Sequence, residues 1–191
     1  MAKRRKIQAS KKTHWINYVV ILGLLACFLV ALSFYLLPFV RYYQLEKAIS
    51  TRDAGAIVNY LNRGELKENI LKRRATMLPV KKATAQAGPL SIVDLAVQWY
   101  EKAARPDFER LFTTEGIYAL MAELGKGAEE DEDAWRLANR VIRNTSFSYQ
   151  SLDRFSLKVK DLQGRFVGYV TFDFAREGLN WQLVDIQFPL F

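Results

Sequence analysis

The stretch FSLKVKDLQGRFVGYVTFDF, residues 155–174, decides the fold class of this 191-residue chain. Apolar and polar residues alternate on both sides of residues 161–164, a short segment with a glycine that is typical of a hairpin turn. A period of two places successive side chains on opposite faces of a β-strand. The stretch therefore predicts two antiparallel strands that share one apolar face.

The alternation extends outward from this hairpin in both directions. Phe147 and Tyr149 alternate with serines before it, and residues 177–178 provide a second turn after it. In the segment after that turn the apolar positions change face beyond Leu183, which predicts a β-bulge or a strand covered on both sides. We therefore predict a four-stranded antiparallel β-meander over residues 145–189.

Residues 41–143 follow the helical period instead. Apolar residues recur there every three or four positions, in segments separated by short polar or proline-containing breaks. The predicted helical segments are 41–52, 53–61, 65–78, 90–103, 114–124 and 134–143. Helices that precede an antiparallel sheet must cover one of its faces, so the fold class is α+β. Cystatin-like and nuclear-transport-factor-like folds are examples of this arrangement.

The sequence also predicts the N-caps of two helices and the environment of one basic run. Asp53 is expected to cap the second helical segment and Thr114 the fifth, because such side chains accept hydrogen bonds from the first backbone N–H groups. The basic run at residues 72–74 is interpreted as a solvated helix face. A patch that docks on lipid headgroups or an anionic partner is the alternative for this run.

Five consecutive acids, residues 129–133, precede the last predicted helix, where they favour the positive end of its dipole. They lack the alternating ligands and the central glycine of a calcium loop. The helical period places four apolar residues inward: Trp135, Ala138, Val141 and Ile142. It places three arginines on the outer face: Arg136, Arg140 and Arg143.

The N-terminal part of the chain is a candidate membrane anchor, because no charged residue occurs between Lys12 and Arg41. A hydrocarbon core about 30 Å thick needs about 20 apolar helical residues, and residues 18–40 supply them. We therefore predict a transmembrane helix over residues 15–40.

Cleavage of this segment is the alternative to a retained anchor. The apolar run is longer than the 7–15 residues that a secretory signal needs, and no Ala-x-Ala site closes it. Residues 24–27 resemble a bacterial lipoprotein signal that ends at Cys27, which would then carry a lipid. Cleavage there would leave the apolar residues 28–40 at the new N-terminus, so we favour the uncleaved anchor with Cys27 as a buried thiol.

Basic residues before the anchor predict its orientation. The six bases in this tail are Lys3, Arg4, Arg5, Lys6, Lys11 and Lys12, and no acid accompanies them. By the positive-inside rule residues 1–14 form a cytoplasmic tail and residues 41–191 are exported. Without these six bases the chain has 22 bases and 20 acids, which argues against a nucleic-acid groove.

Several short motifs resemble a known family. They include Pro-Phe at residues 38–39, Arg-Asp-Ala at 52–54, LFTTEG at 111–116 and GLNWQLVDI at 178–186. Their order resembles a bacterial family of single-span membrane proteins that is defined by domain of unknown function 2939, and the resemblance covers nearly all of residues 38–191. It implies a bacterial inner-membrane address and brings no known activity.

Candidate chemical groups are sparse in the predicted exported domain. The single histidine, His14, precedes the anchor, which excludes a His-based triad or zinc site in the domain. No cysteine lies beyond Cys27, so the domain has no disulfide and no thiol chemistry. Asp173 and Asp185 are placed to face each other across the last hairpin and are the remaining acid pair. We expect no cofactor and no metal.

Aromatic residues of the predicted sheet are candidates to line an apolar pocket. They are Phe147, Tyr149, Phe155, Phe166, Phe172 and Trp181. An ordinary packed core is the favoured alternative for them.

These observations together predict a single-pass inner-membrane protein with a periplasmic α+β domain. We expect that domain to be a non-catalytic module that binds a protein or another envelope component, with an envelope protein as the expected partner. A small-ligand or lipid pocket in the same fold is the second hypothesis, and an acid–base enzyme is the third.

Overall fold

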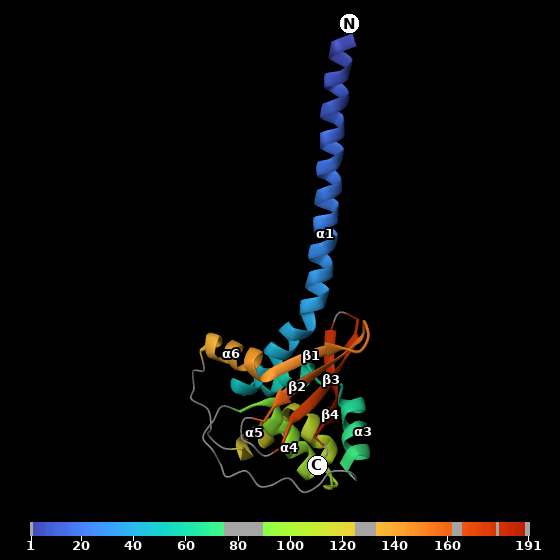
Figure 1. The fold of residues 1–191 in the computed structure, drawn as a ribbon. Helices are drawn as coiled ribbons and strands as arrows, with labels where there is room; N and C mark the ends of the chain where they lie inside the picture. Colours follow the sequence, from blue (N-terminus) through green and yellow to red (C-terminus); the bar gives the residue numbers. More distant parts are fainter. Residues whose placement is uncertain (1, 75–89, 125–132, 162–165, 179, 190–191) are drawn as a thin grey trace. The chain divides into compact units, whose positions relative to one another are not determined.

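The structure is a computed structural model that describes residues 2–74, 90–124, 133–161, 166–178 and 180–189 (Figure 1). The chain divides into two compact units, Met1–Val40 and Arg41–Phe191, and each is described by itself. We call Arg41–Phe191 the C-terminal unit. Helix α1, Ala2–Ser50, supplies the first unit and also the first turns of the C-terminal unit.

The C-terminal unit has the predicted α+β order of helices followed by strands. Its further helices are α2 (Ala54–Asn59), α3 (Arg63–Arg74), α4 (Ile92–Lys102), the 3₁₀ helix η1 (Phe108–Phe112), α5 (Thr114–Glu123) and α6 (Ala134–Asn144). Its strands are β1 (Thr145–Tyr149), β2 (Arg154–Lys160), β3 (Tyr169–Glu177) and β4 (Asn180–Gln187). The fold class predicted from the sequence is confirmed. Residues 75–78 of the third predicted helix lie outside the described residues.

The sheet is the predicted antiparallel meander, with strand order β1-β2-β3-β4. The predicted bulge is also confirmed, because the β3–β4 register shifts between Asp173 and Phe174. Asp173 pairs with Asp185 and Phe174 pairs with Leu183, so one residue of β4 has no counterpart on β3. The apolar positions of β4 change face there because the extra residue advances the strand by one position.

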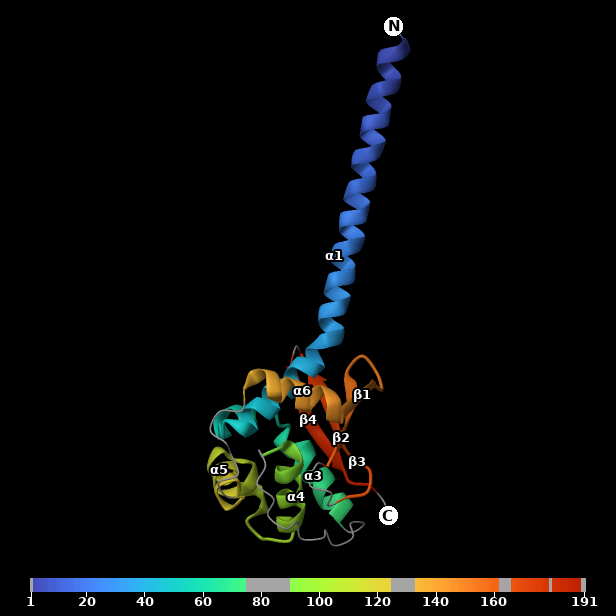
Figure 2. The ribbon, with the colours of Figure 1, turned by 60° about the vertical axis from the view of Figure 1, so that its left-hand side comes forward.

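The apolar face of the sheet forms the core with the helices. The side chains of Phe155, Leu157 and Phe172 are at most 1% exposed. Helix α4 is tied to β4 by the Tyr100 hydroxyl, which donates a 2.6 Å hydrogen bond to the carbonyl of Ile186. The two ribbon views show α4 packed against the sheet and α3 beside β4 (Figures 1 and 2).

The free edge of β4 is closed by the segment between α2 and α3. The N–H of Leu183 donates to the carbonyl of Tyr60 at 2.8 Å, and the N–H of Asn62 donates to the carbonyl of Leu183 at 3.0 Å. This parallel bridge at Leu61 covers part of an edge that would otherwise present unpaired backbone groups.

One predicted cap is confirmed and the other is wrong. The carboxylate of Asp53 accepts a 2.9 Å hydrogen bond from Ala56 N–H at the start of α2. The cap of helix α5 is Thr113 and not Thr114, because the Thr113 hydroxyl accepts a hydrogen bond from Gly116 N–H at 3.2 Å. The backbone of Thr113 is extended, with φ −88° and ψ 165°, whereas Thr114 already belongs to the helix.

Candidate functional site

The predicted acid pair lies on the polar face of the sheet, where Asp173 and Asp185 occupy paired positions. The guanidinium of Arg73 binds both oxygens of Asp185, with Nε 3.1 and 3.0 Å away and Nη2 2.6 Å from Oδ2. The amide of Gln187 donates to Oδ2 of Asp173 at 2.6 Å and lies 3.4 Å from Oδ2 of Asp185. The two carboxylates are thus brought together, and a cation and an amide bind them.

The same network continues across the sheet to β2. The hydroxyl of Ser156 donates to Asp173, and the amide of Gln150 donates to Ser156. Side chains from α3, β4, β3 and β2 are therefore joined in one hydrogen-bonded series. Such a series fixes the strand register and the position of α3, which are structural roles.

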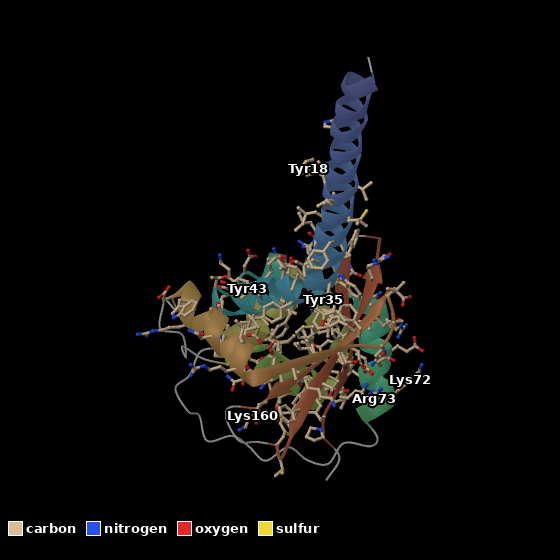
Figure 3. All side chains as sticks on the ribbon, turned by 45° about the horizontal axis from the view of Figure 1, so that its top comes forward. Tyr18, Tyr35, Tyr43, Lys72, Arg73 and Lys160 are labelled. Atoms are coloured by element: carbon tan, nitrogen blue, oxygen red, sulfur yellow. The ribbon has the colours of Figure 1, made fainter. Side chains whose placement is uncertain are left out.

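Arg73 is a residue whose role sequence reasoning missed. The run at residues 72–74 was expected to be solvated; Arg73 is 43% exposed, but its guanidinium is also bound to Asp185, a contact that the expectation did not include. These hydrogen bonds raise the pKa of the Arg73 guanidinium, so it stays charged. Lys72 fits the expectation: it is exposed and pairs with Glu68 on the same helix (Figure 3).

A second polar cluster surrounds Glu46, a carboxylate near the end of α1 that is 2% exposed. Its Oε1 accepts hydrogen bonds from the Tyr42 hydroxyl at 2.8 Å and from the N–H of Ile92 at 3.4 Å. Its Oε2 accepts no hydrogen bond from the described residues and lies 3.9 Å from Nη1 of Arg140. The cluster thus connects α1 with the start of α4 and with α6.

Burial dominates the electrostatics of this cluster. It raises the pKa of the Glu46 carboxyl, and the nearby Arg140 guanidinium partly offsets that rise. It also raises the pKa of the Tyr42 hydroxyl, which therefore remains a hydrogen-bond donor at neutral pH. The sequence offered one weak signal for the cluster, a glutamate four residues after a tyrosine on an apolar helix face.

The inner face of α6 differs from the prediction. Leu137 and Val141 are buried, at 2% and 3% exposure, whereas Trp135 and Ile142 are 70% and 58% exposed. The prediction that Trp135 and Ile142 face inward is therefore wrong.

The prediction that Arg140 faces outward is wrong as well, because its side chain is 16% exposed and directed at Glu46. A buried carboxylate requires a nearby cation or donor, and this requirement selects the face of α6 that packs.

Three of the candidate pocket aromatics, Tyr149, Phe155 and Trp181, contact one another. Phe155 contacts Trp181 and Phe174, with ring centroids 5.1 and 4.7 Å apart, and Tyr149 lies 6.3 Å from Phe155. The fully buried Phe172 lies on the same apolar face.

The remaining two candidates are Phe166 and Phe147. Phe166 packs against Phe188, with ring centroids 4.8 Å apart, and Phe147 is 38% exposed. The structure thus brings Tyr149, Phe155 and Trp181 into contact, and a pocket stays a prediction.

Helix α1 contains the candidate membrane span. From Tyr18 onward it is long and apolar enough to cross a membrane, by length and composition, and a signal sequence has the same properties. The thiol of Cys27 is exposed in this segment. The predicted topology residues lie in α1 and their side chains are outside the described part: Lys3, Arg4, Arg5, Lys6, Lys11 and Lys12.

Among the residues that the structure describes, no group of three His, Cys, Asp or Glu side chains is arranged to hold a metal ion.

The fold and the helix α1 define an α+β protein with one N-terminal apolar helix. A family model described as "Protein of unknown function (DUF2939)" matches residues 27–120, which supports the resemblance carried by the motifs at residues 38–39, 52–54 and 111–116. The matched residues run from the apolar part of α1 into α5 and end before the sheet. Searches of the curated proteins and of the solved structures found no match.

Proposed function

We propose that the protein is a single-pass membrane protein of the bacterial envelope whose C-terminal unit binds an envelope protein and catalyses no reaction. Residues 1–14 lie in the cytoplasm and the C-terminal unit lies in the periplasm. The apolar length of α1 supports the membrane span, and the six bases in residues 1–14 support the orientation.

The non-catalytic assignment rests on the chemistry of the best candidate groups. Asp173 and Asp185 are bound by Arg73 and Gln187 in a network that ties elements together. The single histidine lies outside the C-terminal unit, at position 14. The aromatic rings make direct contacts with one another, which supports a packed core rather than a ligand pocket.

The observation that carries partner binding is a pair of exposed side chains at one end of β3. Val167 is 84% exposed and Tyr169 is 51% exposed, and Tyr169 pairs with the exposed Lys160. An exposed tyrosine beside an exposed apolar side chain is typical of residues that bind proteins.

Site-specific crosslinking in cells tests this proposal. A photoactivatable amino acid replaces Val167 or Tyr169 in the full chain, and crosslinked products are purified from membranes and identified by mass spectrometry. We expect one reproducible envelope protein from both positions. The matched control is Tyr118 of α5, which is 65% exposed and lies outside this surface.

Two outcomes decide whether a partner binds at Val167 and Tyr169. Loss of the crosslink when Lys160→Glu is added supports a partner at this surface. Equal products at Tyr118 and at the two test positions, or products at none of them, would overturn partner binding here.

A further inference from the structure

Two segments of the C-terminal unit, α6 and the turn between β1 and β2, carry exposed apolar side chains that are not part of the protein core. Trp135 and Ile142 are seven residues apart on α6, which places them on the same side of the helix two turns apart. Leu152, in the turn between β1 and β2, is 88% exposed.

Both elements are tied to the point where the C-terminal unit begins. Arg140 of α6 lies 3.9 Å from Glu46, and only six residues of chain separate Glu46 from Val40. Six residues span at most about 21 Å even when fully extended. The chain that leaves Val40 therefore leads directly into the part of the C-terminal unit that contacts α6.

The turn that carries Leu152 is held near the same point. The guanidinium of Arg41 donates to the side chain of Asn180 at 2.9 Å, at the start of β4 and next to the turn between β3 and β4. The N–H of Arg176 donates to the carbonyl of Asp153 at 2.8 Å, which places the two turns side by side. Within the C-terminal unit, both ribbon views show α6 and the β1–β2 turn at the end where residues 41–50 begin it (Figures 1 and 2).

We propose that this end of the C-terminal unit rests on the lipid surface of the membrane that α1 crosses, with Trp135, Ile142 and Leu152 at headgroup level. The inference rests on the proposed membrane span. Tryptophan prefers the membrane–water interface, and apolar side chains on one side of a helix partition there with it.

The charges on α6 fit phosphate headgroups without requiring an anionic lipid. Arg136 and Arg143 are exposed, and long basic side chains reach phosphates from a helix that lies at the interface. Asp133 is exposed at the helix start, where its carboxylate accepts from Trp135 N–H at 3.3 Å. Residues 129–132, all acids, precede it in the sequence and lie outside the described residues. We therefore expect α6 to bind zwitterionic lipid as well as anionic lipid.

Tryptophan fluorescence provides a direct test because the four tryptophans differ in environment. Trp99 and Trp181 are 0% and 3% exposed, so quenchers outside the protein do not reach them. Trp15 is removed by Trp15→Phe in the full chain, which leaves Trp135 as the accessible fluorophore. The protein is reconstituted in phosphatidylcholine vesicles with or without brominated acyl chains.

We expect brominated lipid to quench Trp135 and aqueous acrylamide to quench it weakly. The additional variant Trp135→Phe should remove the bromine effect. Quenching by acrylamide but not by bromine would show Trp135 in water and overturn the inference. Protection from both quenchers would show a second copy or another protein on α6, and would overturn it equally.

Matched charge variants locate the contact. Ile142→Asp and Leu152→Asp should each increase the acrylamide quenching of Trp135. Val167→Asp, at an exposed site beyond the other end of β3, should leave it unchanged. Equal effects of all three would contradict a contact at this end.

Flotation of the vesicles separates the two proposals. A chain that floats with its vesicles but keeps Trp135 in water retains the proposed membrane span and loses only this inference. If the chain does not float after reconstitution, both the proposed membrane span and this inference are wrong.

Discussion

Gly116 shows how a single residue fixes the junction of two helices. A Cβ atom at this position would lie 1.8 Å from the carbonyl oxygen of Arg110, so a side chain cannot be accommodated without moving backbone. Its N–H is also the donor that Thr113 caps. The glycine of the LFTTEG motif is therefore required by the close packing of η1 against α5.

We expect Gly116→Ala to lower the free energy of unfolding by about 1–3 kcal/mol, the usual cost of overpacking. Urea denaturation of the full chain in detergent measures it. Gly55→Ala in α2 is the control, because the nearest atom to its added Cβ is 3.5 Å away. That control should be neutral or stabilising by up to about 1 kcal/mol, since alanine favours helix more than glycine. Equal losses in the two variants would contradict the packing argument.

The burial of Glu46 predicts that the free energy of unfolding depends on pH. Because burial raises its pKa in the folded protein, the folded state binds its proton more tightly than the unfolded state. This contribution to stability therefore rises as the pH falls from above the raised folded pKa towards the unfolded value.

We expect Glu46→Gln to remove that part of the pH dependence, so that the variant gains less stability than the wild type on acidification from neutral pH. Urea midpoints measured between neutral pH and about pH 4.5, the ordinary range of a glutamate pKa, provide the comparison. Parallel pH profiles for the two proteins would count against a buried, ionised Glu46.

Polar contacts to β4 help to attach helix α3 to the sheet, in addition to the fully buried side chains of Leu66 and Ile70. The amide of Asn69 donates to the carbonyl of Val184 at 2.8 Å, next to the Arg73–Asp185 pair. The Asp185 side chain is 9% exposed, whereas the Arg73 side chain is 43% exposed. The loss of the guanidinium thus leaves a buried carboxylate without its strongest donors.

We expect Arg73→Ala to cost about 1–3 kcal/mol of stability, the penalty for unsatisfied buried polar groups. Amide hydrogen exchange in α3 should become faster, because the helix loses its tie to β4. Lys72→Ala is the neighbouring control, since its exposed pair with Glu68 is screened by solvent and contributes little to stability. Unchanged exchange in α3 of Arg73→Ala would show that the helix is held in another way.

The elements differ in how far the sequence predicts them. The strands and the bulge follow from local alternation, since a period of two leaves one choice of face. The register of Asp173 with Asp185 follows from the hairpin. Helix α6 carries apolar residues on more than one side, and its buried face is selected by Glu46, which lies almost a hundred residues earlier. Long-range polar partners such as Arg73 leave no local signal for the same reason.

For the whole molecule, cleavage or retention of residues 1–40 decides whether the C-terminal unit stays anchored by α1. We expect the chain to remain uncleaved, so the intact mass from membranes should match all residues, with or without the initial methionine. Cys27→Ser should change neither this mass, beyond the substitution, nor the membrane fraction. A mature chain that begins with a lipid-modified Cys27 would show instead that the apolar segment is a lipoprotein signal.

The bonds that β4 makes have a consequence for the order of folding. Its residues bind Arg41, Tyr60, Asn69, Arg73 and Tyr100. Synthesis at about 5–20 residues per second places roughly 6–25 s between the appearance of Tyr60 and that of its partner Leu183. We expect residues 41–178 to stay incompletely folded during that interval, because contacts of such high sequence separation form last. A chain that completes its fold only with its last strand stays open while it is made, which suits passage through a membrane in an extended state.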